Sequence, residues 1–357
     1  MSRHLLPLAL LPVLAVAQRA QEPNKPYPYR EEQVVYENKK AGVKLAGTLT
    51  LPPSGGPFPA VLLITGSGPQ DRNATVAGHR PFLVLADYLT RRGIAVLRMD
   101  DRGVGGSTGS VMESTTADFA EDVLLGVEYL KARKEINPRQ IGLIGHSEGG
   151  AVAPLAASRS TSVAFIVLMA APGLLGEKLA HLQRESISRA SGISEEKIAR
   201  TRAVDQKMFA VVRSEKDNAA AEKKLREIVG QAMSEAAGVR ISGAVVEAQF
   251  KTLLSPWYRF FLACDPAPAL RKVKCPVLAI TGERDLQVPP NENLPLIAKA
   301  LAAGRNSDFT IMKLPRLNHL FQTCQTGTYS EYSKLEETIA PVVLETIGDW
   351  ILRRTRP

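Results

Sequence analysis

The sequence predicts an α/β protein with a mostly parallel, doubly wound sheet and an inserted helical segment. Short apolar runs alternate with amphipathic runs over residues 60–169. Strands that are apolar throughout are typical of parallel sheets covered by helices on both faces, joined by right-handed crossovers. Between residues 174 and 268 the alternation stops and the chain becomes charged and helical, and afterwards the strand pattern resumes. We therefore expect one large domain with a helical insertion.

A pair of strands is expected ahead of the alternating region. The segments 33–37 (QVVYE) and 43–51 (VKLAGTLTL) are rich in β-branched residues and alternate in polarity. They precede a Pro/Gly break at residues 52–59. These features predict two strands at the start of the sheet.

The alternating region supplies the next strands and helices in turn. Its apolar runs predict strands at residues 60–65, 94–98, 141–145 and 163–169. Helical spacing of apolar residues predicts helices at residues 81–92, 118–134 and 148–158. After the insertion come strands at residues 275–282 and 308–314 and a final amphipathic helix, residues 341–354, which begins at a proline.

The insertion itself reads as helices followed by an aromatic cluster. Charged helical patterns cover residues 193–209 and 219–237. The cluster contains Trp257, Tyr258, Phe260 and Phe261. These rings could line a pocket for an acyl group, although an apolar seam that fixes the insertion to the core is the simpler interpretation.

The first residues have the anatomy of a signal peptide. A basic residue stands near the start, an apolar run covers residues 5–17, and small residues Ala15 and Ala17 precede Gln18. The run is short for a membrane span. We expect residues 1–17 to be cleaved, leaving no stable membrane span and a periplasmic or secreted protein, with an uncleaved anchor as the alternative. The expected divisions are residues 1–17, 18–173, 174–268 and 269–357 for signal peptide, first part of the core, insertion and second part of the core.

Composition limits the partners. The chain of 357 residues has a net charge of +9, but its 45 Lys and Arg residues are interspersed with 36 Asp and Glu residues. This distribution indicates a solvated surface and argues against a nucleic-acid partner.

Three cysteines, Cys264, Cys275 and Cys324, leave at least one thiol unpaired. A bridge between Cys264 and Cys275 is compatible with the spacing but is not established by it. No second group of ligands accompanies Cys324, so we expect no metal site.

The segment GHSEG, residues 145–149, is the main candidate for chemistry. It fits G-x-S-x-G, and it lies between an apolar strand and a small-residue helix, where that motif places a nucleophilic serine on a sharp turn. Larger side chains two residues on either side of Ser147 would collide. A glycine-rich turn without catalytic function is the alternative.

A serine nucleophile needs a base and an acid later in the chain. Of the five histidines, His319 alone follows the insertion, in the loop after the strand 308–314. For the acid, the loop after the strand 275–282 offers Glu283 and Asp285. Either carboxylate could instead cap a turn.

Backbone N–H groups are needed to stabilise a developing oxyanion. One would belong to Glu148, directly after Ser147, and the other to Ser67, in the glycine-rich loop after the strand 60–65. A phosphate-binding loop is the rival interpretation of that segment. It is weak, because no lysine follows in the required position and no G-x-G-x-x-G is completed.

Together these motifs resemble the α/β-hydrolase superfamily, and within it the bacterial carboxylesterases and serine-aminopeptidase-like hydrolases. The matching stretches are TGSGPQDRN, DDRGVGGSTG, GHSEGG, GERDLQVP and LNHLFQ, in the order of the family. They cover the region from about residue 33 to 354. The resemblance implies an α/β-hydrolase fold whose helical cap is the insertion.

The same resemblance assigns the site. It implies Ser147 as nucleophile, His319 as base and Asp285, in preference to Glu283, as acid, with the N–H groups of Ser67 and Glu148 as the oxyanion hole. Two neighbouring residues, Asp101 and Arg102, are expected to brace loops, and Thr65 stands where many relatives carry histidine. No metal or organic cofactor is implied.

The implied reaction is hydrolysis of a small carboxylic ester through an acyl-enzyme. Aminopeptidase or amidase activity, and thioesterase or acyltransferase activity, would use the same three residues. Acidic residues of the insertion, such as Glu195, Glu196 and Asp217, are mixed with Lys and Arg, as on a solvated helix face, and do not indicate a site for a substrate amine. A binding protein without activity would be expected to have lost one of the three residues.

Overall fold

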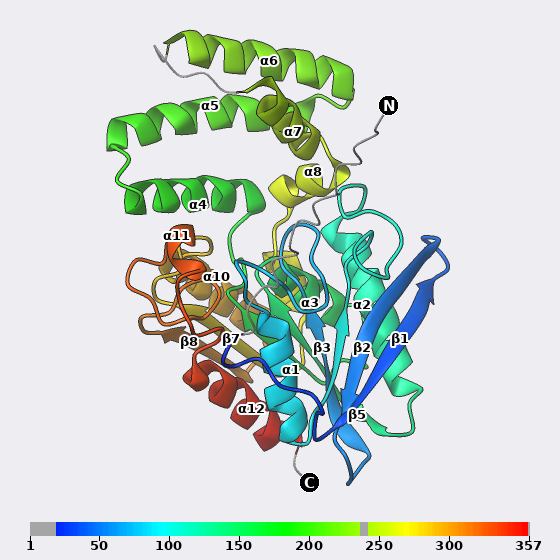
Figure 1. Ribbon diagram of the computed structural model, residues 1–357. Helices are drawn as coiled ribbons and strands as arrows, with labels where there is room; N and C mark the ends of the chain where they lie inside the picture. Colours follow the sequence, from blue (N-terminus) through cyan, green and yellow to red (C-terminus); the bar gives the residue numbers. More distant parts are fainter. Residues whose placement is uncertain (1–18, 236–241, 356–357) are drawn as a thin grey trace, which may run out of the picture.

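The computed structural model describes residues 19–235 and 242–355, so the expected signal peptide lies outside the described residues. Its centre is an eight-stranded sheet with the order β1-β2-β4-β3-β5-β6-β7-β8 (Figure 1). The strands are β1 (Arg30–Asn38), β2 (Val43–Leu51), β3 (Phe58–Ile64), β4 (Ala95–Met99), β5 (Ile136–His146), β6 (Phe165–Met169), β7 (Val277–Gly282) and β8 (Phe309–Leu314). Strand β2 is antiparallel to both of its neighbours, whereas β4 to β8 pair in parallel. The predicted fold class is confirmed.

Helices cover both faces of the sheet, as a doubly wound architecture requires. Strand β3 shows why: Leu62 and Ile64 belong to the apolar cluster on one face, while Val61 and Leu63 belong to the cluster on the other. The first cluster includes residues of α2 (Thr116–Lys131), α3 (Gly149–Ala157), α9 (Ala267–Lys272) and α10 (Pro290–Ala303). The second includes residues of α1 (Pro81–Arg91) and α12 (Pro341–Thr355).

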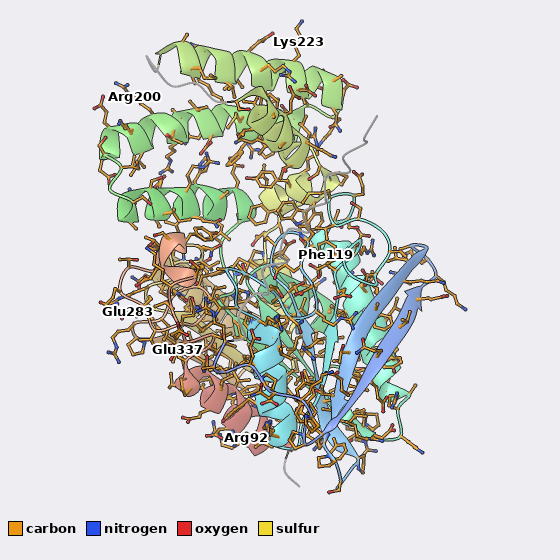
Figure 2. All side chains as sticks on the ribbon, viewed as in Figure 1. Arg92, Phe119, Arg200, Lys223, Glu283 and Glu337 are labelled. Atoms are coloured by element: carbon orange, nitrogen blue, oxygen red, sulfur yellow. The ribbon has the colours of Figure 1, made fainter. Side chains whose placement is uncertain are left out.

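The insertion between β6 and β7 forms a layer of helices above one end of the sheet (Figure 1). Its helices are α4 (Gly176–Ala190), α5 (Glu195–Ser214), α6 (Asn218–Glu235), α7 (Gly243–Leu253) and α8 (Pro256–Ala263). They share a separate apolar cluster, which includes Phe209, Phe250 and Leu262. Charged side chains such as Arg200 and Lys223 project outward from it (Figure 2). We call α4 to α8 the cap.

The sequence analysis did not predict α10, which follows the loop containing Asp285. Pro289 and Pro290 begin this helix and Pro295 lies inside it. Three prolines in one short segment obscure a helical pattern, because proline is a breaker anywhere beyond the first turn. The buried side chains of Leu294 and Ile297 nevertheless attach α10 to the sheet.

Candidate active site

Ser147 lies on a sharp turn where β5 ends and α3 begins. Its φ angle is 55°, in the left-handed region that a non-glycine residue rarely adopts. The turn is held by a hydrogen bond of 2.9 Å from the Ser147 N–H to the carbonyl of Met169 on β6. Strain of this kind is concentrated at functional sites.

The glycines around Ser147 are required by close backbone packing. A Cβ atom on Gly145 would lie 2.0 Å from the carbonyl oxygen of Gly149. A Cβ atom on Gly149 would lie 2.3 Å from the carbonyl oxygen of Ile64, in the neighbouring strand β3. Neither contact is tolerated, so both flanking glycines of the motif have a steric cause.

The structure brings His319 and Asp285 together at the carboxyl edge of the sheet. His319 Nδ1 lies 2.8 Å from Asp285 Oδ2, and both side chains are buried. Because a carboxylate only accepts hydrogen bonds, Nδ1 carries the proton and Nε2 is left as an acceptor. The other carboxylate oxygen, Oδ1, accepts the backbone N–H groups of Gln287 and Val288 at 2.8 and 2.9 Å. The carboxylate is therefore fixed on both sides.

Glu283, the second carboxylate of that loop, has a different position. It is exposed at the surface (Figure 2). Its Oε2 accepts the backbone N–H of Arg316 at 3.0 Å. Of the two candidate acids, Asp285 is the one that contacts His319 in the described part of the chain.

The loop that contains Ser67 packs directly against the turn that carries Ser147. A Cβ atom on Gly66 would lie 3.1 Å from the Ser147 Cβ atom. The backbone N–H groups of Ser67 and Glu148 donate no hydrogen bond within the described part of the chain, and both residues line the same cavity as Ser147. Two unpaired donors beside a strained serine are the arrangement that an oxyanion hole requires.

Asp101 holds this loop in place from behind. It accepts the Thr65 hydroxyl at 2.5 Å and the Gln70 N–H at 2.9 Å, at the two ends of the loop. Burial raises the pKa of Asp101 to about 7, although both hydrogen bonds oppose the shift. Thr65 thus contributes a hydroxyl to this brace.

Arg102 instead fixes α2. Its Nε and one Nη donate to the two carboxylate oxygens of Asp122, at 2.6 and 2.9 Å. Another Nη donates to the Ser114 hydroxyl at 3.1 Å. Asp101 and Arg102 therefore both make bracing contacts, to different elements.

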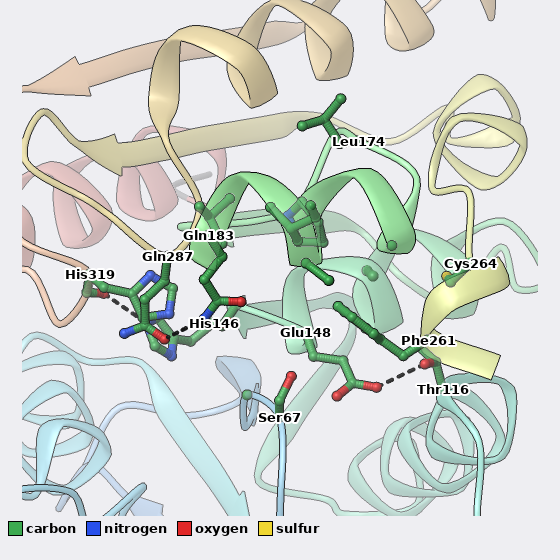
Figure 3. A pocket seen from close by; sticks show the side chains of 18 of the residues that line it. Ser67, Thr116, His146, Glu148, Leu174, Gln183, Phe261, Cys264, Gln287 and His319 are labelled. Atoms are coloured by element: carbon green, nitrogen blue, oxygen red, sulfur yellow. Dashed lines mark hydrogen bonds between the residues drawn. The ribbon is translucent and has the colours of Figure 1, made fainter. Parts of the chain in front are cut away.

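The side chain of Glu148 is a buried carboxylate between the core and the cap. It accepts the Thr116 hydroxyl of α2 at 2.8 Å (Figure 3). It also accepts the Trp257 indole N–H of α8 at 3.0 Å. Burial raises the pKa of Glu148, and hydrogen bonds from Thr116, Trp257 and Ser67 oppose this. The sequence analysis considered only the backbone of Glu148 and missed this role of its side chain.

His146 is a second residue that sequence reasoning missed. Its Nε2 donates to the backbone carbonyl of His319 at 2.9 Å, and the two imidazole rings lie 4.7 Å apart. Burial, followed by the nearby His319, lowers the pKa of His146 to about 3, so the ring is neutral at physiological pH. A histidine beside the serine gives no sequence signal that it will reach a loop 173 residues away.

Ser67, His146, Ser147, Glu148 and His319 all line one cavity of about 570 Å³ between the cap and the core. This volume suits a small organic ligand. Three of the aromatic residues of the insertion, Trp257, Tyr258 and Phe261, line the cavity, and Tyr258 and Phe261 also pack against the apolar cluster of the cap. The aromatic group therefore serves both as a wall of the cavity and as a seam.

The three cysteines are free, so no bridge joins Cys264 to Cys275. Cys264 reaches the cavity, but burial raises its pKa to about 11 and keeps the thiol protonated. Within residues 19–235 and 242–355, no group of three or more His, Cys, Asp or Glu side chains is arranged to hold a metal ion.

The sequence of this chain is similar to those of known hydrolases. A model of the family described as serine aminopeptidase S33 matches residues 80–248, a little under half of the chain. Esterase EstD of Thermotoga maritima is 27% identical over 325 residues, which are 89% of this chain and 68% of that protein.

Solved structures show the same fold. An esterase of Pyrococcus furiosus aligns with a TM-score of 0.52 at 18% identity, covering 92% of this chain and 91% of that chain. The α/β hydrolase GrgF of Penicillium sp. sh18 aligns with a TM-score of 0.55 at 18% identity, covering 91% and 99%. The chain therefore has the α/β-hydrolase fold, and its sequence is similar to that of an esterase. Among its described helices none has the length and apolar character needed to cross a membrane.

Proposed function

We propose that the protein is a carboxylesterase that forms an acyl-enzyme at Ser147. The proposal rests on the cavity where Ser147, the hydrogen-bonded pair of His319 and Asp285 and two unpaired N–H groups meet. His319 takes the proton of Ser147 as the hydroxyl attacks the ester carbonyl, and it then protonates the leaving alcohol. Water then attacks the acyl-enzyme. His319 takes a proton from this water and returns it to the Ser147 oxygen as the acid product leaves.

The remaining groups stabilise charge and position. Asp285 holds the imidazole in the required tautomer and stabilises the imidazolium that forms. The N–H groups of Ser67 and Glu148 donate to the tetrahedral oxyanion, a contribution of about 3–4 kcal/mol per donor in serine hydrolases. No residue outside this set is needed for the chemical steps.

Amide hydrolysis is the second candidate, because the matching family is described as a serine aminopeptidase. An aminopeptidase needs a free carboxylate for the substrate amine. Glu148 is the one acidic residue among the described residues that line the cavity. Its carboxylate already accepts hydrogen bonds from Thr116 and Trp257. This occupancy favours ester substrates.

The test is hydrolysis of p-nitrophenyl esters from acetate to decanoate and of amino-acid p-nitroanilides, with Ser147→Ala as control. We expect esters to be cleaved faster than anilides, and the variant to lose activity down to the residual level. Activity that survives in Ser147→Ala would refute the mechanism. Faster cleavage of the anilides than of the esters would favour amides over esters as the substrate class.

Export remains part of the proposal. Residues 1–17 carry the pattern of a signal peptide. N-terminal sequencing of protein recovered from the periplasm or the medium is expected to give a start near Gln18. A start at Met1 in the membrane fraction would contradict cleavage.

A further inference from the structure

The cavity has two chemically different ends. At one end Gln183 and Gln287 lie near His319 and His146, and at the other Phe261 and Cys264 lie beyond Glu148 (Figure 3). Tyr329 and Tyr332 also line the cavity, and both contact Gln287. We call Gln183, Gln287, Tyr329 and Tyr332 the amide-phenol cluster. The second end is the aromatic wall of α8.

The amide-phenol cluster is a connected polar network. The Tyr329 hydroxyl donates to Gln287 Oε1 at 2.6 Å, and Gln183 Nε2 donates to the same oxygen at 3.3 Å. Gln287 Nε2 in turn donates to the Tyr332 hydroxyl at 3.2 Å. Three elements meet in it: α4 of the cap, the loop after β7, and α11 (Tyr329–Tyr332).

This network is attached to the catalytic pair. The backbone N–H of Gln287 donates to Asp285 Oδ1 at 2.8 Å, and Asp285 Oδ2 contacts His319. Gln183 Oε1 accepts no hydrogen bond from the described residues, so it is available to a ligand hydroxyl. These hydrogen bonds therefore hold the polar end of the cavity beside His319.

The cluster offers neutral groups. Arg184 also lines the cavity, but its Nε lies 3.1 Å from the buried carboxylate of Asp205 inside the cap. Burial raises the pKa of Asp205 to about 6, and Arg184 opposes this. The charge of Arg184 is thus compensated at neutral pH, and amides and phenols are the groups left for recognition.

The mechanism decides which part of an ester occupies which end. A base that protonates the departing alcohol must lie beside its oxygen, so the alcohol occupies the end near His319. The acyl group then extends past the oxyanion hole toward Trp257 and Phe261. This assignment rests on the proposed esterase function.

We propose that the amide-phenol cluster is an alcohol subsite that selects esters of neutral polyhydroxy alcohols. Amide and phenol groups that donate and accept are suited to hydroxyl groups. An analogue that lacks the hydroxyl leaves Gln183 Oε1 without a hydrogen-bond donor, so the cluster discriminates against it. The aromatic wall accommodates an apolar acyl group at the other end.

The test compares two esters with the same acyl group and the same three-carbon alcohol skeleton. Glyceryl 1-(3-phenylpropanoate) carries two free hydroxyls, and propyl 3-phenylpropanoate carries none. We expect wild-type protein to favour the glyceryl ester at least about tenfold in kcat/KM. Gln183→Leu and Tyr329→Phe are expected to bring this ratio toward one, mainly by lowering kcat/KM for the glyceryl ester.

Gln206→Leu is the matched control, because Gln206 is an exposed cap glutamine on α5 outside the cavity. It is expected to keep the wild-type ratio. A wild-type ratio of one or less, or a ratio unchanged in both cluster variants, would overturn the subsite while leaving the esterase function standing.

Binding provides a readout that does not depend on turnover. Calorimetric titration of Ser147→Ala with each ester is expected to give tighter binding of the glyceryl ester. Absence of turnover by wild-type protein would contradict the esterase proposal. Equal binding of both esters, or tighter binding of the propyl ester, would overturn the subsite.

Discussion

The indole nitrogen of Trp257, on cap helix α8, lies 3.0 Å from the carboxylate of Glu148, the residue that follows Ser147. The same residue thus offers its backbone N–H to the cavity and its side chain to the cap. A buried carboxylate costs free energy unless its hydrogen bonds are satisfied. The position of the cap and the geometry of the turn that carries the Glu148 N–H are therefore coupled through one side chain.

Trp257→Phe is expected to lower both activity and stability. It keeps the aromatic ring but leaves the Glu148 carboxylate with one donor fewer, at a cost of about 1–3 kcal/mol. Ester hydrolysis and thermal unfolding measure the two effects. Trp350→Phe is the matched control, since the indole N–H of Trp350 is buried without a partner in the described part of the chain. A loss of kcat as large in Trp350→Phe as in Trp257→Phe would contradict the coupling.

Asp285→Asn is expected to reduce kcat by about 10⁴-fold, the loss seen when a triad aspartate is replaced and the histidine tautomer changes. Glu283→Gln should retain activity within about twofold, because its contact is with the backbone of Arg316 at the surface. Steady-state kinetics on one p-nitrophenyl ester gives both values. The opposite ranking would assign the acid to Glu283.

His146→Phe tests whether the buried ring positions the base. The variant keeps a ring against His319 and removes the hydrogen bond to the His319 carbonyl. A neutral hydrogen bond contributes about 1 kcal/mol, so kcat is expected to fall by about fivefold to tenfold while KM changes little. The activity profile from pH 5 to 9 should keep its shape, because His146 is neutral throughout that range. A shifted profile in this variant would mean that His146 itself titrates during catalysis.

Asp101→Asn tests the brace behind the oxyanion loop. Burial raises the pKa of Asp101 from 3.8 to about 7, so the folded state retains a proton that the unfolded state has lost between these values. Stability from this group is therefore present below about pH 4 and declines as pH rises toward 7. Asparagine resembles the protonated carboxyl, because it can donate to Thr65 and accept from Gln70.

The variant should consequently lose less stability than wild type between pH 5 and pH 8.5. Thermal unfolding at the two pH values measures the difference. Thr116→Val, which removes a hydroxyl from the other buried carboxylate near this loop, serves as a comparison that leaves Asp101 intact. A parallel decline in wild type and Asp101→Asn would show that Asp101 does not titrate in this range.

Local pattern was sufficient to predict much of the fold. Apolar runs in a doubly covered sheet are dictated by burial on both faces, and all eight expected strands occur in the structure. Helix α10 was not predicted, because Pro289, Pro290 and Pro295 obscure the helical spacing of its apolar residues. The expected oxyanion residues, Ser67 and Glu148, line one cavity with Ser147 and His319.

Other features of the site depend on contacts between distant segments. The side-chain roles of Glu148 and His146 arise from partners on the cap and on the loop after β8. The amide-phenol cluster likewise joins three segments far apart in the sequence. No periodicity or motif predicts these contacts, because they depend on how distant segments pack against one another in the folded protein.

The insertion between β6 and β7 also sets an order of events during synthesis. A growing chain emerges from its N-terminus, so the serine turn is made well before the strands that carry Asp285 and His319. Strands β7 and β8 add to the open edge of β6 only after the whole cap has been made. A nascent chain that ends before His319 lacks the residue that contacts Asp285. The candidate site is therefore complete only late, when the last strand of the sheet is in place.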